Sequence, residues 1–235
     1  MNTAFASPII NVLIFILAFC SIVYELLLAQ ALSAFLENTV LRYCVTIGLY
    51  MFSMGLGALA AEEKYTKHPI NTLLSVEILL TLIGGFSLGI LHVLNMLYLP
   101  RIVFSAAAHI LIICIGVLTG FEVPLFFEIV RIKKISSENI VLGVNYFGAF
   151  VGTGCFTFVF YPIAGLMATS FFVGFINALA GTSLMILRGL ISKEALKPFY
   201  RLWTLQVMIL VMIGICLFCS DPINEYFMDR YMNAF

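Results

Sequence analysis

Three glutamates, Glu25, Glu77 and Glu122, lie inside long apolar stretches that contain no lysine or arginine. An ionisable side chain in such surroundings is costly, so it usually serves a function. A carboxylate there can bind a cation, such as an ammonium group, or take up and release a proton. The alternatives are a protonated carboxyl bonded to a neighbouring helix at Glu25 and a side chain that reaches water at Glu77. We interpret all three as candidate ligand-binding or ion-binding positions.

Glu122 has the most specific surroundings, because it lies between Gly120 and Pro124 near the end of an apolar helix. A proline inside a helix removes one N–H and leaves the carbonyl four residues earlier without its donor. The carboxylate and the freed Gly120 carbonyl would form a patch of acceptors suited to an ammonium group or a proton. The alternative is a simple kink, with Glu122 satisfied locally or at a membrane interface.

The helix that follows carries Asn145, Gly148 and Gly152 at helical spacing, after a short basic loop. We expect it to form a hairpin with the helix that carries Glu122. Such a hairpin places Glu122 and Asn145 at similar depth on facing helices, so Asn145 joins the candidate ligand-binding residues.

Glu25 follows Tyr24 in the first apolar stretch, and it shares one helix face with small residues. A face of small residues lets another helix approach closely. Glu25 should therefore point into a helix bundle, with Tyr24 as a candidate neighbour in the site. The small residues of this face are Ala18, Ser21, Ala29 and Ser33.

The composition is that of a membrane protein. The chain of 235 residues is 63% hydrophobic and 10% charged, against roughly 25% charge in a soluble domain. Apolar runs of about twenty residues recur along it, which is typical of a polytopic helical membrane protein. We predict an all-α fold, with about seven transmembrane helices in residues 1–220 and a short polar and aromatic tail in residues 221–235. The predicted spans are 8–34, 40–61, 70–97, 102–129, 140–161, 166–187 and 202–219.

Lysine and arginine are distributed unevenly between the two sides of these spans. The loops after the second, fourth and sixth spans carry nine of the twelve, and the other side carries three. Because basic residues are enriched in cytoplasmic loops, we predict a cytoplasmic N-terminus and an external C-terminus in the cell membrane of a bacterium. The first span should be retained, because its apolar run is longer than that of a signal peptide. The nine residues are Lys64, Lys67, Arg131, Lys133, Lys134, Arg188, Lys193, Lys197 and Arg201.

Most other chemistries lack a matching pattern in this sequence. The net charge of zero gives no general attraction to nucleic acid. The His, Cys and acidic residues lack the spacing of a metal site, and no phosphate-binding or dinucleotide-binding glycine motif is present. We therefore expect neither a metal nor a cofactor. Cys216 and Cys219 could form a redox pair, although two cysteines on one helix face are the simpler interpretation.

Five short motifs follow one another in a characteristic order. They are Tyr24-Glu25-Leu26, Gly55-Leu56-Gly57, Gly120-Phe121-Glu122-Val123-Pro124-Leu125, Asn145-Tyr146-Phe147-Gly148-Ala149-Phe150-Val151-Gly152 and Pro162-Ile163-Ala164-Gly165. Together they resemble the multi-spanning membrane region of membrane-bound spermidine-synthase-like proteins, over about residues 15–190. In that family this region commonly precedes a soluble aminopropyltransferase-like domain of Rossmann type, which binds decarboxylated S-adenosylmethionine or a related nucleoside and a polyamine.

Two departures from this family shape the expected function. The nucleoside loop and acidic catalytic residues of the soluble domain have no counterpart here, and Asn145 stands where the family tends to have aspartate. We therefore expect a stand-alone membrane module that is not catalytic alone and acts with a soluble or membrane partner protein. Its polar cavity would hold a cation, a polyamine-like ligand or a proton. The alternative function is a small transporter or ion-conducting component, and a membrane enzyme that acts on a lipid-like substrate ranks third. The chain could also form a homo-oligomer.

Overall fold

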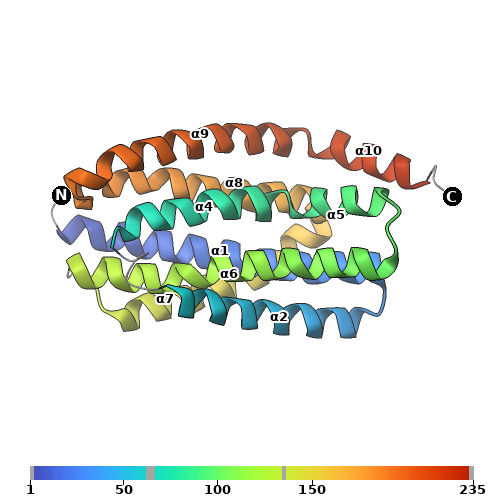
Figure 1. Cartoon of the computed structure of the whole chain (residues 1–235), viewed down its shortest axis with the longest axis horizontal. Coiled ribbons are helices and arrows are strands. Elements are labelled where there is room, and N and C mark those ends of the chain that lie inside the picture. The colour runs from blue at the N-terminus through green and yellow to red at the C-terminus, as the bar shows by residue number, and fades with distance from the viewer. Residues whose placement is uncertain (1–2, 62–66, 134–135, 233–235) are drawn as a thin grey trace.

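The computed structural model describes residues 3–61, 67–133 and 136–232, and every regular element in these ranges is helical (Figure 1). The all-α prediction is therefore confirmed. Most elements are α-helices, whereas η1 is a π-helix and η2 and η3 are 3-10 helices. The elements are α1 (Thr3–Leu36), α2 (Thr39–Ala60), α4 (Pro69–Gly85), α5 (Ser87–Met96), α6 (Arg101–Lys133), α7 (Glu138–Cys155), η1 (Phe156–Ala164), α8 (Gly165–Ser183), η2 (Leu184–Leu190), η3 (Lys193–Ala195), α9 (Leu196–Phe218) and α10 (Ser220–Met232).

The described helices form rods that run back and forth along one axis, and the two termini lie at opposite ends of the bundle (Figure 1). Three rods are the single long helices α1, α2 and α6, and a fourth is α9 continued by α10. The other three rods are composite: α4 with α5, α7 with η1, and α8 with η2. Each predicted apolar segment falls on one of these rods. By length and apolar composition, five helices in the described ranges can cross a membrane, or six if the bent α4–α5 pair is one span.

The composite rods α7–η1 and α8–η2 form one unbroken helical run, Glu138–Leu190, of 53 residues. A straight helix of this length would be about 80 Å long, more than twice the hydrocarbon thickness of a bilayer, about 30 Å. The run instead turns back at Gly165, whose φ of 73° is accessible mainly to glycine. The predicted turn between Pro162 and Gly165 is thus present, and α7 and α8 run in opposite directions (Figure 1).

The third rod is broken, where the sequence predicted one continuous span. Helices α4 and α5 meet at an angle of 43° around Phe86. The break follows two glycines whose backbone is used by neighbours: the Tyr24 ring lies against Gly84, and the Gly85 carbonyl accepts a hydrogen bond from the Ser170 hydroxyl at 2.9 Å. Glycine and serine positions are common sites of helix kinks, and the close approach of α1 and α8 explains the bend.

Helix α1 packs against α2, α6, α7 and α8. On its α7 side, a Cβ at Gly148 would lie 2.5 Å from the carbonyl oxygen of Phe15, and one at Gly152 would lie 2.9 Å from that of Phe19. The residue numbers rise together along both helices, so α1 and α7 are parallel. The glycines of α7 allow this close approach, and among the described contacts of Gly148 and Gly152 only Ala18 of the small face predicted on α1 takes part, where it meets Gly148.

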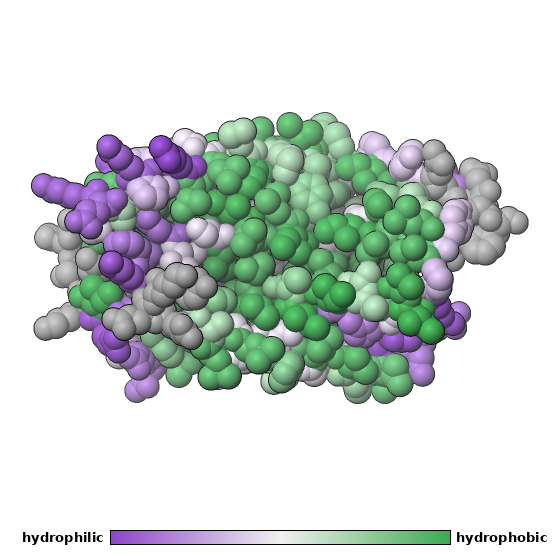
Figure 2. Space-filling view, viewed as in Figure 1, coloured by the Kyte–Doolittle hydropathy of each residue, from purple (hydrophilic) through white to green (hydrophobic). Residues whose placement is uncertain are grey.

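The molecular surface has an apolar band around its middle and hydrophilic side chains at both ends (Figure 2). The end that holds the N-terminus carries Arg131, Arg188, Lys193, Lys197 and Arg201, because the connections after α6 and α8 lie there. The opposite end carries an ion pair of 3.5 Å between Arg101 and Glu37. Lys64 and Lys134 lie outside the described residues.

The C-terminal residues continue the last rod. Helix α10 begins directly after α9, so the predicted tail 221–235 is helical as far as Met232. Cys216 and Cys219, near this junction, are both free thiols in the described structure.

Candidate functional site

Glu77 lies on α4 in a polar node that joins three helices. Its side chain is fully buried, so it does not lean toward water at the basic end. Asn177 of α8 donates its Nδ2 to the backbone oxygen of Glu77 at 3.3 Å and to the Thr81 hydroxyl at 3.1 Å. Gln206 of α9 donates its Nε2 to the same hydroxyl at 3.5 Å and to the backbone oxygen of Ala178 at 3.2 Å. The node ties α4, α8 and α9 together through side-chain amides.

A glycine creates the space for this node. A Cβ at Gly181 would lie 3.2 Å from Cβ of Glu77 and 2.6 Å from Nε2 of Gln206. Both side chains therefore pass over the bare backbone of α8. The glycine lets an acidic and an amide side chain meet in the interior.

The node holds more acceptors than donors. Among the described residues, no hydrogen bond reaches either carboxylate oxygen of Glu77, Oδ1 of Asn177 or Oε1 of Gln206, and all four atoms are buried. A buried polar atom without a partner costs about 1–3 kcal/mol. A proton or a cationic group is the chemical species that would satisfy a cluster of acceptors.

Glu122 of α6 and Tyr24 of α1 complete the cluster. Glu122 is 4% exposed, and its carboxylate is close enough to that of Glu77 for the two charges to interact. The Tyr24 hydroxyl lies within electrostatic reach of both carboxylates, is buried, and has no hydrogen-bond partner in the described ranges. The structure thus brings together Tyr24, Glu77 and Glu122 from three helices, and we call these residues the carboxylate cluster.

Glu25 lies on a different side of α1 from Tyr24, although the two are adjacent in sequence. It is 7% exposed. Tyr50 of α2 lies within electrostatic reach of both Glu25 and Glu122. The Tyr50 hydroxyl donates to the backbone oxygen of Ser21 at 3.1 Å.

Asn145 does not join the cluster. The glycine face of α7 packs on α1, and Asn145, one turn before Gly148, is partly exposed. No hydrogen bond joins Asn145 to Glu122 in the described part of the chain. The predicted similar depth of Glu122 and Asn145 on α6 and α7 stays a prediction, and the glycine face of α7 packs along α1.

The structure also shows how α6 passes Pro124, where the sequence left a kink as the alternative. Helix α6 runs as one α-helix through Pro124. Gly120 serves packing, since a Cβ there would lie 2.2 Å from the carbonyl oxygen of Met54 on α2. The sequence interpretation missed Thr81, Tyr50 and Gln206, whose signal is a polar side chain inside an apolar run.

Comparison with known proteins supports a relationship over most of the chain. The polyamine aminopropyltransferase of Leptospira interrogans is 36% identical over 183 residues, which cover 74% of this chain and 35% of that protein. Polyamine aminopropyltransferase 1 of Streptomyces coelicolor is 32% identical over 180 residues, 74% of this chain and 33% of that protein. Polyamine aminopropyltransferase 2 of the same organism is 29% identical over 226 residues, 90% of this chain and 40% of that protein.

The chain is related to the polyamine aminopropyltransferases. The spermidine-synthase-like relationship predicted from the motifs is therefore confirmed. The chain spans about a third of the length of the first of these curated relatives. No protein-family profile and no solved structure matches it.

Proposed function

We propose that the chain is an integral membrane module whose seven rods each cross the bilayer, with the N-terminus in the cytoplasm of a bacterium. The apolar band between two hydrophilic ends supports insertion (Figure 2). The basic residues gathered at the end with the N-terminus support its cytoplasmic placement. The reversal at Gly165 supports counting Glu138–Leu190 as two crossings.

Within this module, we propose that the carboxylate cluster binds a proton or an ammonium-bearing ligand, and that the chain acts as a non-catalytic subunit beside a partner protein. The observation that carries this proposal is Glu77, whose two carboxylate oxygens are buried without a hydrogen bond among the described residues and lie within electrostatic reach of the Glu122 carboxylate. Two buried acids with no lysine or arginine nearby require a positive species to offset the cost of burial. The relatives' names point to polyamines, which are linear cations with ammonium groups.

Spermidine binding to the purified protein tests this proposal. Isothermal titration calorimetry in a non-ionic detergent should show binding by the wild type. The double variant Glu77→Gln/Glu122→Gln should bind at least tenfold more weakly, because each hydrogen bond to a charged group contributes about 1.5–3 kcal/mol.

Glu128→Gln is the matched control. It makes the same change on the same helix as Glu122, at a surface carboxylate that pairs with Arg131 at 2.9 Å. This variant should bind like the wild type. A folded double variant with unchanged spermidine affinity would remove the cluster from the site.

A second candidate function is proton conduction or transport, which a line of hydroxyls between α1 and α2 favours. At the end away from the N-terminus, Tyr43 donates to Gln30, and Gln30 donates to the Tyr161 hydroxyl at 2.8 Å. Tyr50, two turns further along α2, bonds to Ser21 and lies within electrostatic reach of Glu122. Proton flux into liposomes by the wild type, lost in the same double variant and without spermidine binding, would select this candidate.

A further inference from the structure

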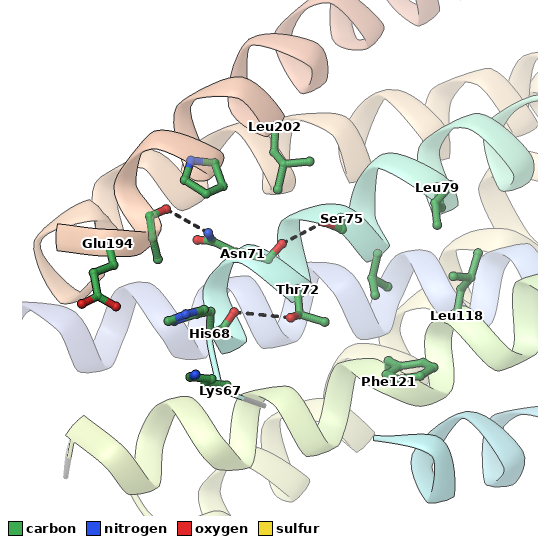
Figure 3. A pocket seen from close by; sticks show the side chains of 13 residues that line it. Lys67, His68, Asn71, Thr72, Ser75, Leu79, Leu118, Phe121, Glu194 and Leu202 are labelled. Carbon is green, nitrogen blue, oxygen red and sulfur yellow. Dashed lines mark hydrogen bonds between the residues drawn. The ribbon is translucent and has the colours of Figure 1, made fainter. Parts of the chain in front are cut away.

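A groove lies between α4, α6 and α9, near the end that holds the N-terminus (Figure 3). Its volume is about 550 Å³. Lys67, His68 and Asn71 line one end, and Leu79 and Leu118 line the other. The groove is therefore amphipathic along its length, with a polar mouth and an apolar interior, and no residue of the carboxylate cluster lines it.

The length of this groove matches one leaflet of a bilayer. His68 and Leu79 are eleven residues apart on one helical stretch, which corresponds to about 17 Å. Half of the hydrocarbon core is about 15 Å thick. A ligand in the groove can thus extend from the headgroup level to the middle of the bilayer.

The mouth of the groove carries a positive excess. A second hollow of about 480 Å³ shares Lys67 and His68 with the groove and adds Lys193. Glu194 lines both hollows and is the acidic side chain among their described lining residues. Helix α4 begins at this mouth, and the side chain of its N-cap residue, His68, makes no capping hydrogen bond. Pro69 has no N–H, and the N–H groups of Asn71 and Thr72 already donate to the His68 backbone oxygen at 3.0 and 3.1 Å. The positive charge that favours a phosphate here therefore comes from the two lysines, with a smaller contribution from the positive end of the α4 dipole.

We propose that this groove is a binding site for an anionic phospholipid of the cytoplasmic leaflet. The phosphate lies between Lys67 and Lys193 at the start of α4, and one acyl chain follows α4 toward Leu79. The proposal rests on the membrane insertion proposed above and is independent of what the carboxylate cluster binds.

Native mass spectrometry of the purified protein tests the site. The wild type is incubated with equal amounts of phosphatidylglycerol and phosphatidylcholine that carry the same acyl chains. It should retain phosphatidylglycerol in preference. Lys67→Gln/Lys193→Gln should lower the ratio of bound phosphatidylglycerol to phosphatidylcholine by about fivefold per lysine, since a basic residue near an anionic lipid surface contributes about 1 kcal/mol.

Lys197→Gln/Arg201→Gln is the matched control, because it removes the same charge from exposed positions at the same end that line neither hollow. It should keep the lipid ratio within twofold of the wild type. Ser75→Phe narrows the groove and should reduce retention of both lipids.

Three outcomes would overturn the proposal. They are equal retention of the two lipids by the wild type, an equal loss of preference in both double variants, and displacement of phosphatidylglycerol by inorganic phosphate, which would indicate a site for a soluble anion. None of these outcomes bears on spermidine binding or proton flux, so the two proposals fail separately.

Discussion

At the scale of single residues, Glu77 carries a buried ionisable group whose two carboxylate oxygens receive no hydrogen bond from the described residues. The amide oxygens of Asn177 and Gln206 are likewise buried without a hydrogen bond among the described residues. The amide nitrogens of Asn177 and Gln206 donate to backbone and hydroxyl oxygens of the node. Such an arrangement is unfavourable for folding alone. A site that binds a positive species has a reason to keep it, since activity and stability often conflict at functional positions.

Glu77→Gln should therefore stabilise the protein in the absence of ligand. Glutamine has the same shape, and its NH₂ group can donate to the free oxygens of Asn177 or Gln206. Satisfying one such buried oxygen is worth about 1–3 kcal/mol, which corresponds to a rise of about 2–12 °C in Tm for a chain of this size. Thermal unfolding in detergent measures it.

Glu77→Ala provides the contrast, because it removes the carboxylate without supplying a donor and leaves a cavity. It should gain less than the glutamine variant or lose stability. A Tm for Glu77→Gln at or below that of the wild type would show that the node is already satisfied by the acid.

The sequence located Glu25, Glu77 and Glu122 as ionisable residues in apolar runs, but it could not show which of them meet. Glu77 looked able to reach water because it lies two turns from a basic loop. It is buried because α8 and α9, a hundred or more residues later in the chain, cover it through Asn177 and Gln206. Such contacts leave no periodic signal in one sequence.

At the scale of elements, glycines decide how closely the helices pack. Helices α2 and α6 are in contact where Gly57 meets Val117, and a Cβ at Gly57 would lie 2.1 Å from the Val117 carbonyl oxygen. Gly55, two residues earlier on the same helix, has no atom within 4 Å of such a Cβ. The Gly55-Leu56-Gly57 motif therefore contains one glycine that packs against another helix and one with open space beside it. The sequence alone did not show which glycine was which.

Gly57→Ala should destabilise the protein, because the backbones of α2 and α6 must separate to admit the methyl group. Overpacking of this kind typically costs about 1–3 kcal/mol. Gly55→Ala should be neutral or stabilising by up to about 1 kcal/mol, because alanine favours a helix more than glycine does.

Thermal unfolding of the two variants in the same detergent measures this difference. Equal Tm values for the two variants would contradict the contact between α2 and α6. Apolar length predicted these helices to within a few residues, whereas the bend at Phe86 depended on neighbours that close on Gly84 and Gly85.

At the scale of the whole molecule, the proposed topology predicts on which side of the membrane each end of the chain lies. An odd number of crossings places the N-terminus and the end of α10 on opposite sides, as their positions in the bundle suggest (Figure 1). The basic end should face the cytoplasm.

Reporter fusions in bacterial cells test this arrangement. Alkaline phosphatase, which is active outside the cytoplasm, should be active when fused after residue 232. It should be inactive when fused within the connection after α6 or after η2. Activity at all three positions, or at none, would contradict seven crossings.

The parallel contact between α1 and α7 has a consequence for biosynthesis. The side of α1 that carries Phe15, Ala18 and Phe19 emerges from the ribosome early, but its partner surface around Gly148 and Gly152 is more than a hundred residues away in the chain. During translation this side of α1 must therefore stay without its partner helix until three further rods have been made and α7 arrives. The insertion machinery or the lipids must shelter that first helix, and the final bundle can close only when α7 takes its place along it.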